Sequence, residues 1–103
     1  MRRAAMRDAG ESLIVAMLRA VGAAVYRLDG KDIPDLIAFH RGRTFLLEVK
    51  APPGPRGGTS GLGRRLRPGQ AEFRATAASR GVTVHVVTSA DEALAAIGVE
   101  VSE

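Results

Sequence analysis

Residues 34–50, PDLIAFHRGRTFLLEVK, decide the fold, because they hold two apolar runs on either side of a short polar segment. The runs have the length and residue types of β-strands, and the HRGR segment at 40–43 is typical of a tight turn. The stretch therefore predicts a β-hairpin. Counting inward from the turn places Asp35 roughly opposite Glu48, so two carboxylates are expected to share one end of the sheet.

The patterns on either side of this hairpin add helices and two further strands. The expected elements are helices over about 3–21, 68–80 and 90–97, and strands over 24–28, 35–39, 44–50 and 82–87. Ser89, with Glu92 three positions later, forms a capping box that marks the start of the last helix. In the first helix, the apolar residues that should face the sheet are Ile14, Met17, Leu18 and Val21. The order αβββαβα predicts an α/β fold in which helices flank a small mixed sheet.

The length of 103 residues, with 46% hydrophobic and 25% charged residues, is that of one ordinary globular domain spanning 1–103. No apolar run reaches the roughly 18 residues that span a membrane, and no signal-peptide pattern follows the basic N-terminus. We therefore expect no membrane partner and a cytoplasmic location, in a bacterium or a phage-infected host. The absence of cysteine excludes disulfides and thiolate metal sites, and the two histidines argue against a histidine zinc site.

The charge favours a nucleic-acid partner. The chain has 15 basic and 11 acidic residues, a net charge of +4, and arginine at thirteen of the basic positions. Arginine binds two phosphate oxygens at once, which suits a nucleic-acid backbone. A coding sequence that is rich in G and C would give the same excess of arginine, so composition leaves both readings open. A basic Gly/Pro/Arg segment at 51–67 is expected to be a mobile loop.

The carboxylates that interrupt the hairpin strands carry the candidate chemistry. Side chains alternate along a strand, so Glu48 and Lys50 should share one face and Val49 the other. Asp35 and Glu48 would repel each other at close range, and Mg²⁺ or Mn²⁺ would relieve that repulsion. A metal held by carboxylates beside a lysine suits phosphodiester hydrolysis. The simpler alternative is a set of solvated charges at strand ends, with Lys50 neutralising Glu48.

Two further polar residues are expected to face the sheet. Glu11 lies on the apolar stripe of the first helix, one turn before Ile14, where an isolated carboxylate would be costly. Gln70 lies in the first turn of the second long helix, in line with Phe73 and Ala77. A helix-dipole acid at Glu11 and a cap substitute at Gln70 remain alternative interpretations.

This pattern resembles a known superfamily. The Pro-Asp pair at 34–35, followed by Glu-Val-Lys at 48–50, resembles the signature of the PD-(D/E)XK nucleases. Glu11, the compact DIPDL segment at 32–36, and Gln70 after a basic loop look most like the virus-type replication-repair nuclease (VRR-NUC) domain in its stand-alone form. Archaeal-type Holliday junction resolvases are similar in outline.

The resemblance implies a restriction-endonuclease-like core and a metal-dependent DNA endonuclease of DNA repair. Its expected substrates are branched DNAs such as Holliday junctions or flaps, and its expected form is a homodimer. The implied roles are metal ligation by Asp35, Glu48 and the Val49 carbonyl, water activation by Lys50, a second metal or metal-bound water at Glu11, and support of the site or a phosphate contact by Gln70.

The basic residues near this end of the sheet are the expected DNA contacts, namely Arg56, Arg64, Arg65, Arg67 and Lys31. Asp29 and Asp32, which flank Gly30, are expected to form a turn. Two other functions stay open: a non-catalytic nucleic-acid-binding module on the same fold, and a restriction-type or RNA-directed nuclease. A complete set of acidic residues argues against pure binding, which needs no buried carboxylates.

Overall fold

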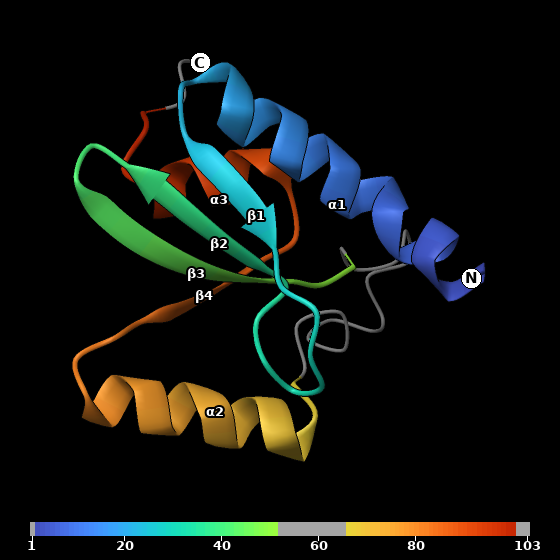
Figure 1. Cartoon of the computed structure of the whole chain (residues 1–103), viewed down its shortest axis with the longest axis vertical. Coiled ribbons are helices and arrows are strands. Elements are labelled where there is room, and N and C mark those ends of the chain that lie inside the picture. The colour runs from blue at the N-terminus through green and yellow to red at the C-terminus, as the bar shows by residue number, and fades with distance from the viewer. Residues whose placement is uncertain (1, 52–65, 101–103) are drawn as a thin grey trace, which may run out of the picture.

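The computed structural model describes residues 2–51 and 66–100. Its helices are α1 (Arg2–Ala20), α2 (Pro68–Ser79) and α3 (Ala90–Ala96), and its strands are β1 (Ala24–Arg27), β2 (Leu36–His40), β3 (Arg43–Val49) and β4 (Val84–Val87) (Figure 1). The predicted order αβββαβα and the predicted α/β class are confirmed. Each boundary lies within two residues of its expected position.

The four strands form one mixed sheet in the order β1-β2-β3-β4. β1, β2 and β3 are successively antiparallel, whereas β4 runs parallel to β3. A parallel neighbour requires a crossover connection, and α2 lies within the one that joins β3 to β4.

The β2–β3 hairpin has the register that brings its two acidic residues to one end. Arg41 and Gly42 form the turn, with φ of 53° and 79°. Positive φ at both central positions is what a type I′ turn requires, and such a turn matches the twist of the strands. The N–H of Asp35 donates to the carbonyl oxygen of Leu47 at 3.0 Å. Asp35 therefore lies just before the start of β2, level with Glu48.

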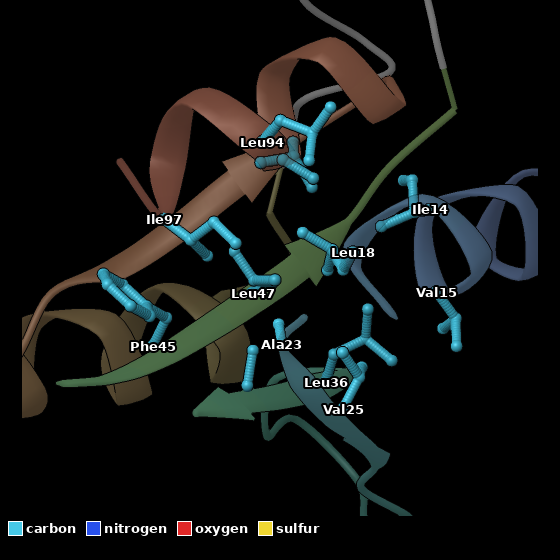
Figure 2. Close-up of a cluster of buried hydrophobic side chains, with 13 residues drawn as sticks. Ile14, Val15, Leu18, Ala23, Val25, Leu36, Phe45, Leu47, Leu94 and Ile97 are labelled. Carbon is cyan, nitrogen blue, oxygen red and sulfur yellow. The ribbon is translucent and has the colours of Figure 1, made fainter. Parts of the chain in front are cut away.

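The helices divide unequally between the two faces of the sheet. α1 and α3 cover one face and α2 lies on the other (Figure 1). Alternation along β3 buries Phe45 and Leu47 beneath α1 and α3 and turns Glu48 toward α2. Figure 2 shows the resulting core, which includes Ile14, Val15, Leu18, Val25, Leu36, Phe45, Leu47, Leu94 and Ile97.

The predicted apolar stripe of the first helix is half right. Ile14 and Leu18 are buried, as expected, but Met17 and Val21 are 38% and 37% exposed. Val21 follows the end of α1 and lies in a turn, so the helical spacing no longer applies to it. Met17 is one position from Leu18, about 100° around the helix, and therefore sits at the margin of the buried face.

The start of α3 has half of the predicted capping box. The Ser89 hydroxyl accepts from the Glu92 N–H at 3.1 Å, as expected for an N-cap. The Glu92 carboxylate accepts from Thr88, at 2.7 Å from its N–H and 3.0 Å from its hydroxyl. The reciprocal bond of a capping box would run to Ser89 N–H instead, and the competing Thr88 donors explain the difference.

Two expectations from the sequence, a mobile basic segment and the lack of a membrane-spanning helix, can be compared only with the residues that the structure describes. Most of the basic segment at 51–67, with Arg56, Arg64 and Arg65, lies outside them, so its expected mobility stays a prediction. Among the residues that are described, no helix combines the length and the apolar character that a bilayer span needs.

Candidate active site

A cleft of about 670 Å³ opens where β2 begins and β3 ends. Its walls come from the start of α2, the β1–β2 connection and α1. All the candidate catalytic side chains line it, namely Glu11, Asp35, Glu48, Lys50 and Gln70. The structure thus brings together residues from three separate parts of the chain.

Asp35 is held in place by the backbone of the neighbouring strand. Its Oδ2 accepts from the Val49 N–H at 2.8 Å, while its own N–H donates to Leu47. These two bonds orient the half-buried carboxylate across the end of the hairpin, beside Glu48. The expected role of the Val49 carbonyl as a metal ligand stays a prediction, whereas its N–H acts here as an anchor for Asp35.

Glu48 is the buried acid of the cleft, with only 4% of its surface exposed. Burial disfavours its charged form, and the charge and hydrogen bonding of Asp35 disfavour it further. Together they raise the pKa of Glu48 from 4.5 to about 7, against a smaller lowering by Lys50. A buried acid with a shifted pKa in an open cleft is typical of a functional site.

Gln70 joins the two charged ends of the site. Its Oε1 accepts from Lys50 Nζ and from the Arg67 N–H, each at 2.9 Å. Because both of these partners are donors, the carboxamide can face them only through its oxygen, and its Nε2 is left to donate to Glu48 Oε2 at 2.8 Å. The amide is 7% exposed and its orientation is determined by its neighbours.

Lys50 lies beside this network with its ammonium turned inward. Its side chain is 15% exposed, and Nζ is 3.6 Å from Glu48 Oε2. The Lys50 N–H donates to Val87 at 2.9 Å, which continues the β3–β4 ladder up to the edge of the cleft. An ammonium has three protons, so one bond to Gln70 leaves donors for a water or a phosphoryl oxygen.

Glu11 reaches the cleft from the opposite layer, through α1. It is 1% exposed, and its Oε2 accepts from Arg27 Nε at 2.8 Å. Arg27 is the last residue of β1 and also donates to the Ser12 hydroxyl at 3.2 Å. The buried charge of Glu11 is therefore compensated by a guanidinium, as the cost of burying a carboxylate requires.

Arg27 was not singled out by the sequence, although a signal was present. Strand alternation puts Arg27 on the same face of β1 as the buried Val25, which is the face that α1 covers. An arginine on that face needs a partner, and Glu11 is an acid on the apolar stripe of the facing helix.

The carboxylates fit a hard divalent cation, although they do not form a complete metal cage. Within residues 2–51 and 66–100, no three His, Cys, Asp or Glu side chains group closely enough to hold a metal by themselves. Mg²⁺ is commonly bound by one or two carboxylates, with waters and substrate phosphates completing its shell. The Asp35–Glu48 pair meets that requirement. Burial first and the charge of Asp35 second raise the pKa of Glu48, and a cation would relieve the repulsion between the two carboxylates.

Two of the residues that are expected to contact DNA, Lys31 and Arg67, lie in the part of the chain that the structure describes, and both line the cleft. Lys31 lies exposed in the β1–β2 connection, and Arg67 precedes α2 with 61% of its side chain exposed. Asp29 and Asp32 also line the cleft, and the Asp32 carboxylate lies 3.4 Å from the Arg67 guanidinium, so its mouth carries both signs of charge above an acidic floor. Lys31 and Arg67 are the described cations there that can contact phosphates.

Comparison with known proteins identifies the fold. The chain is similar to a solved structure described as a VRR_NUC domain, with a TM-score of 0.64 and 23% identity, over 84% of this chain and 88% of that one. No protein-family model matches the chain, and no curated protein matches it closely. The fold is therefore of the restriction-endonuclease-like class. Within that class it is the fold of a VRR-NUC domain, which the sequence pattern predicted.

Proposed function

We propose that this chain is a Mg²⁺-dependent endodeoxyribonuclease that hydrolyses phosphodiester bonds in branched DNA, such as Holliday junctions or flaps. The observation that carries the proposal is the bonded series Glu48–Gln70–Lys50, with Asp35 beside Glu48, on the floor of an open cleft that Lys31 and Arg67 also line. The likeness to a VRR_NUC domain supports a nuclease-family domain.

Asp35 and Glu48 would hold Mg²⁺ or Mn²⁺, with the Val49 carbonyl and Glu11 as the further ligands that the sequence pattern implies. The cation would supply Lewis acidity at a phosphoryl oxygen and a bound water of lowered pKa.

The remaining side chains act on position and charge. Gln70 keeps Glu48 and Lys50 at fixed separation, because one carboxamide contacts both. Lys50 can direct its remaining N–H donors at the attacking water or at the phosphate, where negative charge grows in the transition state. Arg67 and Lys31 would bind flanking phosphates and hold the strand across the cleft.

The preference for branched DNA follows from the layout of the site. The described basic residues that line the cleft can contact phosphates, which position a strand without reading its base sequence, so recognition of DNA shape is favoured. A four-way junction offers two symmetric strands, which a homodimer with two clefts would cut together. A cytoplasmic place in DNA repair is consistent with such a substrate.

The test is incubation with single-stranded, duplex, flap and four-way substrates of matched sequence, with Mg²⁺, with Mn²⁺ and with excess chelator. We expect cleavage of the branched substrates that requires the metal. Binding without cleavage would instead indicate a non-catalytic module, and cutting of plain duplex at one sequence would indicate a restriction-type enzyme. Size-exclusion chromatography with light scattering checks the dimer.

A further inference from the structure

Asp32 holds an unusual position beside the cleft. It lies in the β1–β2 connection with a φ of 64°, a conformation that side chains other than glycine adopt infrequently. Its carboxylate sits against Gly69, in the first turn of α2, and its Oδ1 is 3.4 Å from the Arg67 guanidinium. The connection therefore reaches across to the N-terminal end of α2 (Figure 1).

The start of α2 is suited to this contact. α2 has no acidic residue in its first turn, although the free N–H groups there favour a negative charge. Gly69 has no side chain, and a Cβ at that position would overlap the Asp32 carboxylate. Glycine at position 69 leaves this space free, and a Cβ there would displace the carboxylate from it.

This contact connects the two segments that build the site. Asp35 follows Asp32 by three positions, and Gln70 follows Gly69 directly. Few other contacts hold α2 to the sheet near the cleft, since Gln70 is its only buried residue. A shift of α2 by about 1 Å would stretch the bonds from Gln70 to Glu48 and Lys50.

We propose that Asp32 is a positioning residue: its carboxylate, seated over Gly69, docks the β1–β2 connection onto α2 and thereby keeps Gln70 bonded to Glu48 and Lys50. The part of this inference that concerns metal binding rests on the proposed function. The docking itself concerns the metal-free chain and is tested without metal or DNA.

Two variants test the docking from its two sides, Asp32→Gly and Gly69→Ala. If backbone preferences alone decided, both variants would stabilise the protein. Glycine adopts the positive φ at position 32 more readily than aspartate, and alanine is a better helix former than glycine at position 69. The proposal predicts the opposite change in stability, so each variant should lower the Tm. In the Asp32→Gly background the change Gly69→Ala should become neutral or stabilising, because the carboxylate that it meets is gone.

Gln70 itself supplies a direct readout. It is the chain's only glutamine, and there is no asparagine, so one side-chain NH₂ pair in a ¹H–¹⁵N spectrum reports on it. That pair should shift or broaden in both variants and stay at its wild-type position in Asp91→Ala. Asp91 is a matched control, since it is an exposed acid in the first turn of α3.

The outcomes separate the possibilities. A lowered Tm with an unmoved Gln70 signal means that Asp32 stabilises the fold only, and overturns the positioning role. Raised Tm values in both single variants overturn the docking. A Mg²⁺ titration can be followed through the rise in Tm. The Mg²⁺ concentration at half of the full rise should increase several-fold in both variants and stay unchanged in Asp91→Ala. If the Gln70 signal moves but this Mg²⁺ concentration does not change, the link between Asp32 and metal binding is contradicted. If the wild-type chain binds no Mg²⁺, the proposed function is contradicted, and the Gln70 signal alone then decides whether Asp32 docks the connection.

Discussion

Gln70 Nε2 donates a 2.8 Å hydrogen bond to Glu48 Oε2, across 22 positions of sequence. The same carboxamide accepts from Lys50 through its oxygen. A neutral residue thus lies between an acid and a base that are 3.6 Å apart, and contacts both. Hydrogen bonds through one side chain thus connect the charged groups of the site, which are not separate solvated charges at strand ends.

Replacing Gln70 should therefore impair catalysis more than folding. In Gln70→Ala, both Glu48 and Lys50 lose a partner, and we expect cleavage to fall about 10- to 100-fold, as is usual when a supporting contact of a metal site is removed. Single-turnover rates at saturating DNA measure this loss. Thr76→Ala, on the exposed side of α2, is the control and should cleave like the wild type.

Removing either carboxylate of the pair should abolish cleavage. Asp35→Asn is the sharper variant, because its amide oxygen can still accept from the Val49 N–H and so preserve the hairpin end. We expect circular dichroism unchanged and Mg²⁺-dependent cleavage reduced to background in Asp35→Asn and in Glu48→Gln. Wild-type cleavage by Asp35→Asn would remove this residue from the active site.

Stability of the metal-free protein should depend on pH through Glu48. Its pKa is raised from 4.5 to about 7 by burial and by Asp35, so the folded chain holds this proton more tightly than the unfolded chain. The stability that results is fully present below pH 4.5 and is lost as the pH rises through about 7. The full effect is roughly 3 kcal/mol.

Glu48→Gln isolates this effect. The lowered pKa of His85, caused by burial and by Arg74, acts in the opposite direction near the same pH but is common to both proteins. The stability of Glu48→Gln relative to the wild type should therefore increase between pH 4.5 and 8, as measured by urea unfolding in chelator. Saturating Mg²⁺ should shrink or reverse the difference. A difference that does not vary with pH would contradict the raised pKa.

The sequence predicted the hairpin site well because local rules govern it. The turn at Arg41 and Gly42 sets the register, and strand alternation puts Glu48 and Lys50 on one face. Gln70 could be placed because it follows a proline at a helix start and lies in line with apolar neighbours. In each case, the chain near the residue determines where its side chain points.

Strand alternation indicates which face of β1 Arg27 occupies, but neither its pairing with Glu11 nor the Asp32–Gly69 contact could be predicted from local rules alone. Each depends on how two layers sit relative to one another, and Asp32 meets Arg67 across 35 positions. Asp32 reads as an ordinary turn residue, since nothing local distinguishes a turn carboxylate in water from one that reaches a helix. Such contacts emerge only when the layers are assembled.

Arg27 should stabilise the fold through the buried Glu11. In Arg27→Met, the carboxylate loses its guanidinium in a site that is 1% exposed. We expect a loss of about 2 kcal/mol, the usual scale for a hydrogen bond to a charged group. Glu11→Gln in the same background should recover most of it. Additive losses in this double-mutant cycle, measured by chemical denaturation, would show that the two residues act independently.

The last prediction concerns the arginines that precede α2. Arg67 lines the cleft, and Arg64 and Arg65 come shortly before it in the sequence. Each phosphate contact on duplex DNA adds about 0.9 to the magnitude of the slope of log affinity against log salt. Replacing all three with alanine should therefore weaken binding and flatten the slope by roughly two to three units. Cleavage at saturating DNA should change much less, because the chemistry lies on the floor of the cleft.

Two further variants distinguish the loss of specific phosphate contacts from the effect of a lower net charge. Arg64→Ala with Arg65→Ala leaves Arg67 free to pair with Asp32, so a slope change of roughly two units there cannot come from disturbing α2. A matched triple replacement of Arg41, Arg74 and Arg80 removes the same charge from positions that do not line the cleft, and should flatten the slope less. Equal slopes for the two triple variants would mean that the arginines at 64–67 act only through net charge.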